Sequence, residues 1–196
     1  MKCGKSQQLI SDFAPWRYTR QQVGLFQPER NVRDEGIRSR IGTVAPDARK
    51  VSSIWEIVEQ PLDRIGIDEI HMFQPGDVDA VAALLEKGAT VVACGLDMDY
   101  KRDHYEIVLR LLKLADDVSL RRAVCHGCSR YTARYTQVYS RGVAVTGGLP
   151  SVIPDDGTYA YEPVCRSCFV SRENRPPAET RLRSGNLPIP GMSELG

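Results

Sequence analysis

Two pairs of cysteines with C-x-x-C spacing, Cys125/Cys128 and Cys165/Cys168, constrain the fold of this chain more than any other feature. Each pair can sit on a tight turn that aims both sulfurs at one point, about 2.3 Å from a shared zinc ion. Four thiolates complete a tetrahedral sphere and leave no position for water or substrate. Such a zinc site is structural, and its binding energy helps to fold the segment that carries it.

Unrelated thiols or a redox-active C-x-x-C motif are the alternatives. A redox motif would explain one pair and leave the other without a role. In a reducing compartment, clustered cysteines are better explained as metal ligands than as disulfides. We therefore prefer the zinc site, which anchors both ends of the segment 129–164 at one point. A loop held in this way can lie over a bound ligand.

Upstream of the cysteines, the sequence alternates between strands and helices. Three continuous apolar runs are expected to be buried strands, namely Val23–Phe26, Arg64–Ile70 and Thr90–Gly95. Two segments with helical spacing follow such runs, one from Asp77 to a stop at Gly88 and one over Tyr105–Leu114. This order indicates an α/β fold, in which a mostly parallel sheet carries helices on both faces.

The remaining segments have weaker signals. A short helix is expected over Gln7–Phe13, ended or kinked by Pro15. The charged stretch Glu29–Arg40 reads as an exposed loop. Short strands are expected at Val118–Val124 and Tyr131–Tyr139, on either side of the first cysteine pair.

Charge and hydropathy exclude several classes of function. The formal net charge is only +1, which gives no general electrostatic reason to bind nucleic acid. No apolar stretch approaches the roughly 20 residues that span a bilayer, and no secretory segment opens the chain. We therefore expect a cytosolic protein with no membrane partner.

The first residues contain a candidate phosphate-binding loop. Met1–Ser6 ends in Gly-Lys-Ser, the last part of the pattern G-x-x-x-x-G-K-[ST]. In such a loop, backbone N–H groups cradle phosphate, Lys5 meets the outer phosphates, and the Ser6 hydroxyl ligates magnesium. Gly-Lys-Ser alone also occurs by chance. Cys3 beside two lysines is either an activated thiol or, as we prefer, a small residue that lets the loop close.

Two adjacent carboxylates strengthen this interpretation. Asp68 and Glu69 end a predicted buried strand, where an acid that organises magnesium is expected in phosphate-loop proteins. An isolated pair of this kind would be read as solvated acids at a strand end. Together with Gly-Lys-Ser and the α/β pattern, the functional reading is favoured. Cys94, in the next strand, is most simply a core residue.

These motifs together resemble the zinc-containing, tetrameric cytosolic type of thymidine kinase. Met1–Ser6 resembles the end of that family's Gly-Pro-Met-x-x-Gly-Lys-Ser loop, Ile67–Phe73 resembles its I-D-E-x-Q-F-F segment, and Gly95–Tyr100 resembles G-L-D-x-D-F. The resemblance runs to about Phe169 and includes further motifs in the family's order: Leu114–Asp116, Tyr135–Gln137, Tyr161 ahead of the second cysteine pair, and Ser39–Gly42, which is similar to some bacterial members.

The resemblance implies a P-loop NTPase-like (RecA-like) domain over residues 1–117, a zinc and lasso subdomain over 118–170, and a tail over 171–196 that we expect to be disordered. It implies transfer of the γ-phosphate of ATP to the 5′-hydroxyl of thymidine, in nucleotide salvage, by a homotetramer. Glu69 would be the general base. The expected ATP and magnesium contacts are Met1, Lys2, Cys3, Gly4, Lys5, Ser6, Asp68, Glu69, Ile70 and His71.

The resemblance also assigns the nucleoside side. The expected substrate contacts are Met1, Leu96, Tyr100, Thr136, Val152, Ile153, Pro154, Asp155, Asp156 and Tyr161. His71 and Met72 replace the family's usual Gln and Phe, and Pro154–Gly157 replaces its smoother approach to the lasso tyrosine. Deoxyuridine or a modified deoxynucleoside is therefore an alternative substrate.

Two other kinds of protein are alternatives. One is a non-catalytic relative that keeps the fold and the zinc. The other is a zinc-ribbon nucleic-acid binder, which the balanced charge and the order of the kinase motifs oppose. The phosphate loop lacks its first glycine and the strand before it, so we expect codons upstream of Met1 to encode a short β-branched strand ending in Gly-Pro.

Overall fold

The computed structural model describes residues 3–32, 35–39, 42–153 and 156–170, and its centre is a four-stranded parallel sheet. The strand order is β4 (Arg49–Val51), β1 (Val23–Pro28), β5 (Arg64–Ile67) and β6 (Thr90–Ala93). Leu25, Gly66 and Val92 are neighbours in its register. Each of the three predicted apolar runs forms a strand of this sheet.

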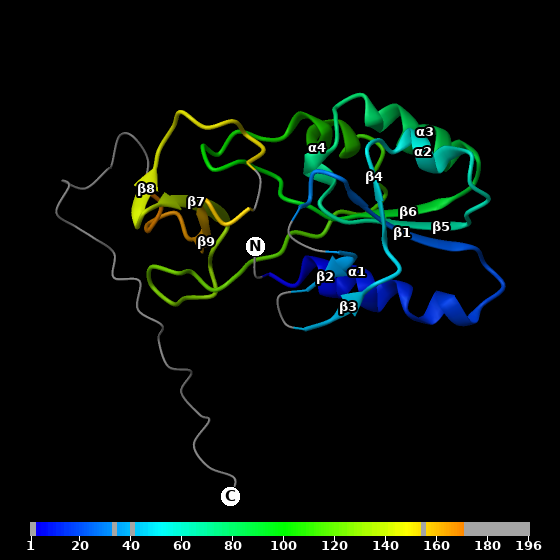
Figure 1. Ribbon diagram of the computed structural model, residues 1–196, viewed down its shortest axis with the longest axis horizontal. Coiled ribbons are helices and arrows are strands. Elements are labelled where there is room, and N and C mark those ends of the chain that lie inside the picture. The colour runs from blue at the N-terminus through cyan, green and yellow to red at the C-terminus, as the bar shows by residue number, and fades with distance from the viewer. Residues whose placement is uncertain (1–2, 33–34, 40–41, 154–155, 171–196) are drawn as a thin grey trace, which may run out of the picture.

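Three helices cover one face of the sheet, at the top of Figure 1. They are α2 (Trp55–Val58), α3 (Asp77–Glu86) and α4 (Glu106–Leu111). Their apolar side chains share one buried core with β1 and β5. α3 ends as predicted, where Gly88 adopts a φ of 84°. α4 is shorter at both ends than the segment 105–114 expected to form it.

The opposite face carries α1 (Lys5–Phe13), followed by a 3-10 turn over Pro15–Tyr18. Phe13 of this helix packs against the sheet at Gly66. A Cβ atom on Gly66 would lie 2.5 Å from Leu25 Cδ2 and 3.1 Å from Phe13 Cζ. Only glycine therefore lets α1 pack this closely. The prediction of a parallel sheet with helices on both faces is confirmed.

The expectation of an exposed loop over Glu29–Arg40 is wrong. Ile37 is fully buried, and β2 (Ile37–Arg38) pairs with β3 (Val44–Ala45) in a small hairpin beside α1. Residues 33–34 and 40–41 lie outside the described ranges. The charged neighbours of Ile37 hid its role, because one apolar residue gives no periodic pattern.

The last strand of the sheet, β6, is less buried than its sequence suggested. Thr90 and Ala93 are exposed, while Val91 and Val92 are half-buried. In the described part of the chain, β6 pairs with β5 and with no strand on its other edge. The side chains of an apolar run are buried only where other elements cover the faces of the strand, and the half-buried Val91 and Val92 show that β6 is only partly covered.

The second sheet belongs to the cysteine-bearing part of the chain, at the left of Figure 1. It contains β8 (Val143–Val145), β7 (Tyr135–Ser140) and β9 (Ala160–Val164), all antiparallel. β7 overlaps the second half of the expected strand 131–139 and extends one residue past it. The expected strand 118–124 does not form, apart from one bridge between Ala123 and Ala133.

In the described ranges, no helix is long and apolar enough to cross a bilayer. The tail over 171–196 falls outside those ranges, and the domain boundaries remain predictions.

Candidate functional site

A cavity of about 440 Å³ lies between the parallel sheet and the cysteine-bearing subdomain. Three groups of residues line it: the start of α1, with Lys5 and Ser6; the segments after β5 and β6, with Glu69 and Leu96; and the small sheet, with Thr136. Parallel strands bring their carboxyl ends to one edge, which is why segments distant in sequence meet here.

The start of α1 has the geometry of an anion site. Gly4 adopts φ 77° and ψ 17°, a left-handed conformation that favours glycine, and the helix begins at the next residue. Free backbone N–H groups at a helix start carry partial positive charge. Lys5 adds a full charge, with its Nζ 4.0 Å from Glu69 Oε2 and both side chains less than a fifth exposed.

The surroundings of Lys5 and Asp68 shift the pKa values of both side chains. Burial by itself would lower the pKa of Lys5, but the carboxylates of Glu69 and Asp68 outweigh it and raise that pKa above its usual value. Burial, followed by repulsion from Glu69, raises the pKa of Asp68. The Lys5 ammonium is therefore a permanent cation in the cavity.

Asp68 does not line the cavity but lies directly behind it. The side chain is 3% exposed, and its Oδ1 accepts hydrogen bonds from the Glu69 N–H at 2.9 Å and the Cys94 thiol at 3.0 Å. A hydrogen bond with Ser6 favours its charged form. Cys94, which was predicted to be a simple core residue, therefore also makes a polar contact.

Glu69 adopts an unusual backbone conformation, with φ 49° and ψ 42°. A non-glycine residue in this region carries strain that its surroundings must compensate. The hydrogen bond from Glu69 N to Asp68 and the one from Ile70 N to Cys94 O (3.0 Å) supply that compensation. The turn aims the Glu69 carboxylate into the cavity, while Ile70 packs in the core.

His71 connects three segments of the wall. Its Nδ1 accepts a hydrogen bond from Leu96 N at 3.3 Å and lies 3.5 Å from Glu69 Oε2, and its ring packs on Tyr105 at 4.8 Å. Burial, with a smaller contribution from Lys5, lowers the pKa of His71 to about 4, despite the opposing effect of Glu69. The imidazole is therefore neutral at physiological pH.

Two tyrosines tie the long loop of the small subdomain to the sheet. The Tyr100 hydroxyl donates to Leu149 O and accepts from Leu149 N, each at 2.9 Å. The Tyr105 hydroxyl donates to Ser151 O at 2.9 Å. These contacts position the next residues, Val152 and Ile153, in the cavity wall.

Of the predicted ATP and nucleoside contacts, twelve line the cavity: Cys3, Gly4, Lys5, Ser6, Glu69, His71, Leu96, Tyr100, Thr136, Val152, Ile153 and Tyr161. Asp156 is exposed in a turn, where its carboxylate accepts from Thr158 N. Met1, Lys2, Pro154 and Asp155 lie outside the described residues.

Sequence reasoning missed nine wall residues: Asn31, Arg38, Ser39, Met72, Met98, Asp99, Tyr105, Val138 and Ser151. Asn31, Arg38 and Ser39 belong to the segment that was read as an exposed loop. Tyr105 was assigned to a helix, although its position shortly after the Gly95–Tyr100 region was a usable signal. The others flank predicted contacts by one or two positions.

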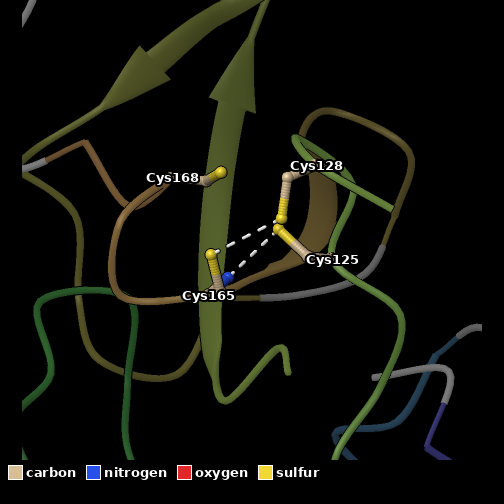
Figure 2. Close-up of side chains that lie close together, drawn as sticks. All are labelled: Cys125, Cys128, Cys165 and Cys168. Atoms are coloured by element: carbon tan, nitrogen blue, oxygen red, sulfur yellow. Dashed lines mark hydrogen bonds between the residues drawn. The ribbon is translucent and has the colours of Figure 1, made fainter. Parts of the chain in front are cut away.

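The four clustered cysteines have the geometry of a tetrahedral site. With metal–sulfur bonds of about 2.3 Å, two sulfurs of a zinc tetrathiolate lie about 3.8 Å apart. Cys128 Sγ and Cys165 Sγ are 3.8 Å apart, and all four sulfurs lie within 4.8 Å of one another. Figure 2 shows the four side chains pointing toward one region. The residues therefore fit a zinc ion.

Backbone features support this cluster. Cys165 N donates to Cys125 Sγ at 3.2 Å, which favours a thiolate. A Cβ atom on Gly127 would lie 3.0 Å from Cys168 Sγ, so a larger residue would crowd the site. Ser129 follows the first pair with a φ of 58°. The chain is thus shaped tightly around the sulfurs.

Comparison with known proteins agrees with this geometry. A sequence model of the family described as thymidine kinase matches residues 1–169. The chain belongs to the thymidine kinase family.

Individual thymidine kinases are similar over most of their length. The thymidine kinase of Mycoplasma capricolum subsp. capricolum is 32% identical over 180 residues, covering 87% of this chain and 85% of its own. That of Mesoplasma florum is 30% identical over 179 residues, covering 86% and 87%. That of Pseudothermotoga lettingae is 28% identical over 173 residues, covering 86% and 90%.

We predict that this thymidine kinase family member binds one zinc ion per chain and that Cys165→Ser removes most of it. Three thiolates bind zinc less tightly than four, and the lost binding energy also destabilises the small subdomain. Metal analysis and thermal unfolding measure both effects. Cys94→Ser, which keeps a hydrogen-bond donor outside the cluster, is the control. Unchanged zinc content in Cys165→Ser would contradict the site.

We also predict that His71 makes folding stability depend on pH. Its folded pKa lies below its unfolded value of about 6.5, so the unfolded chain binds more protons between pH 6.5 and 4. This contribution is fully present above pH 6.5 and is lost as the pH falls toward 4. Between pH 7 and pH 5, the unaltered protein should lose about 2 kcal/mol more unfolding free energy than His71→Gln.

Urea unfolding at the two pH values measures this difference. His104→Gln is the control, because His104 is an exposed histidine in a nearby loop. Equal pH dependence in the unaltered protein and His71→Gln would mean that His71 is not buried as a neutral group.

Proposed function

We propose that this protein transfers the γ-phosphate of ATP, bound with magnesium, to the 5′-hydroxyl of thymidine, yielding dTMP and ADP for nucleotide salvage. One observation carries the proposal. A single cavity runs from Lys5 and Ser6 at a helix start, past the Glu69 carboxylate, to Tyr100 and Tyr161. A phosphate donor and a nucleoside can therefore occupy its two ends with a carboxylate between them.

The donor end would hold the triphosphate. Backbone N–H groups around Gly4 and the Lys5 ammonium would bind phosphate oxygens, as the resemblance also implies for Met1 and Lys2. Ser6 and Asp68, which share a hydrogen bond, have the oxygen donors that Mg²⁺ prefers. Magnesium neutralises phosphate charge as part of the ATP substrate.

Glu69 would act on the acceptor hydroxyl. Its left-handed turn aims the carboxylate into the cavity, and Lys5 stabilises the charged form. In a loose phosphoryl-transfer transition state, the hydroxyl proton leaves late. An ordinary carboxylate within hydrogen-bond distance can then orient the 5′-oxygen and accept its proton.

The nucleoside end is mostly apolar. Leu96, Thr136, Val152, Ile153 and Tyr161 form a wall that suits a planar pyrimidine ring with a methyl group. The Tyr100 hydroxyl is engaged by Leu149, so this ring contributes a surface. Deoxyuridine lacks only the methyl group, which is worth about 1 kcal/mol of burial, and it remains the alternative substrate.

A non-catalytic relative is the second candidate function, and the open edge of β6 is the observation that favours it. An unpaired sheet edge can accept a strand from another chain, and Val118 and Leu120, which follow α4, are more than half exposed. A homotetramer and a cytosolic location, where zinc thiolates stay reduced, are also part of the proposal.

We predict that Glu69→Gln lowers kcat for thymidine at least 10²-fold with little change in KM, because general-base contributions are of this order. The amide keeps the shape of the side chain but cannot accept the proton. Steady-state kinetics with Mg-ATP measure both constants. Glu86→Gln, on the exposed end of α3, is the control. Unchanged kcat with a raised KM would assign Glu69 to ligand binding alone.

A further inference from the structure

A second hollow, more open to solvent than the first, shares Met98 with it and is strongly basic. It has a volume of about 400 Å³, and four of its seven lining residues are cations: Lys101, Arg102, Arg134 and Arg166. Asp103 is the only acid in its wall. The whole chain has a formal net charge of only +1, so this concentration of positive charge is local.

Two of the arginines lie over a pair of aromatic rings that pack at a tilt against each other. Arg102 lies over the Phe169 ring at 5.1 Å, and Arg166 lies over the Tyr135 ring at 5.7 Å. The two rings contact each other at 5.5 Å and are buried in the core of the small subdomain. A guanidinium stacked on a ring keeps its N–H edge available for an anion.

The charges in this cavity are only partly balanced. Lys101 lies 3.8 Å from Asp103 and 3.5 Å from Asp99, and Arg134 lies 3.8 Å from Asp97. Within the described ranges, neither Arg102 nor Arg166 forms an ion pair. Like charges held together in a concave site raise its potential and favour a bound anion.

The backbone of the turn that carries Lys101 and Arg102 is hydrogen-bonded to one buried aspartate. The Asp99 side chain is fully buried, and its Oδ1 accepts from Lys101 N at 2.8 Å and Asp103 N at 3.0 Å. Arg102 adopts a φ of 76°, which its N–H supports by donating to Asp99 O at 3.1 Å. The cations on this turn are therefore positioned before any ligand arrives.

We propose that this basic cavity binds the phosphates of a small oligophosphate, as a site separate from the cavity that holds Lys5. Two guanidiniums and an ammonium suit bidentate and point-charge contacts to several phosphate oxygens. The low net charge of the chain opposes a nucleic-acid backbone as the occupant. Met98 lines both cavities, so the new site shares a wall with the proposed nucleoside pocket.

Binding of tripolyphosphate to the zinc-loaded full chain tests this proposal by calorimetry. The double variant Arg102→Gln/Arg166→Gln should weaken one binding event at least tenfold, while Lys5→Ala should leave that event unchanged. Arg17→Gln/Arg110→Gln makes the same change in net charge, using exposed arginines paired elsewhere with Asp47 and Glu106, and should have no effect. Loss of all binding in Lys5→Ala alone would overturn the proposal.

A measurement on the unaltered protein avoids any dependence on how the variants fold. Phenylglyoxal modifies accessible arginines, and tripolyphosphate should protect Arg102 and Arg166 but not Arg17, as read by mass spectrometry. Protection by a deoxynucleoside triphosphate at lower concentration than by tripolyphosphate would identify a nucleotide as the source of the phosphates, and equal protection would identify a free oligophosphate. Absence of protection, or stronger protection by a single-stranded oligonucleotide, would overturn the proposal. Neither experiment measures thymidine phosphorylation, so failure of the oligophosphate site and failure of the proposed kinase activity are distinguishable.

Discussion

The buried contact between Lys5 and Glu69 is the constraint on which the arrangement of the site depends. Both side chains are less than a fifth exposed, so each charge needs the other where water is scarce. Lys5 is the first residue of α1, and Glu69 lies just after β5, a strand of the central sheet. Pairing them fixes α1 against the carboxyl end of the sheet. The apolar contact at Gly66 fixes the same helix from the side, and together they set the width of the cavity.

The small subdomain forms one wall of the cavity and is held there by its cysteine cluster and by two tyrosines of the larger domain. The cysteine cluster gathers both ends of the segment 129–164 at one point, while Tyr100 and Tyr105 hold its middle at Leu149 and Ser151. A loop restrained at its ends and its centre loses little further entropy when a ligand binds beneath it. The cysteine cluster does not line the cavity, but it contributes to the shape of the cavity wall.

The sequence predicted what repeats or clusters, and it failed where burial depends on a single residue. Three strands of the parallel sheet, the helix ended by Gly88 and the four cysteines have strong local signals, and the structure contains all of them, whereas the edge strand β4 was not predicted. Ile37 was missed because its charged neighbours hide it, although it fills the space beside α1. β6 was expected to be buried because its sequence is apolar, yet burial of a strand depends on neighbours that its own residues do not encode. Tyr105 acts through a hydrogen bond to the backbone of Ser151, which is distant in the sequence, so its helical pattern does not reveal this contact.

The backbone strain at Glu69 follows from the same arrangement. A regular strand would carry successive side chains to opposite faces, so Asp68 and Glu69 could not both act near one point. The left-handed turn at Glu69 breaks that alternation: Asp68 stays beneath the loop with Ser6 and Cys94, and Glu69 points into the cavity. His71, one turn further, accepts a hydrogen bond from the segment after β6 and prevents the turn from relaxing. The strain of one residue is thus compensated by hydrogen bonds from the segments after β5 and β6, and it lets two adjacent carboxylates act near one point.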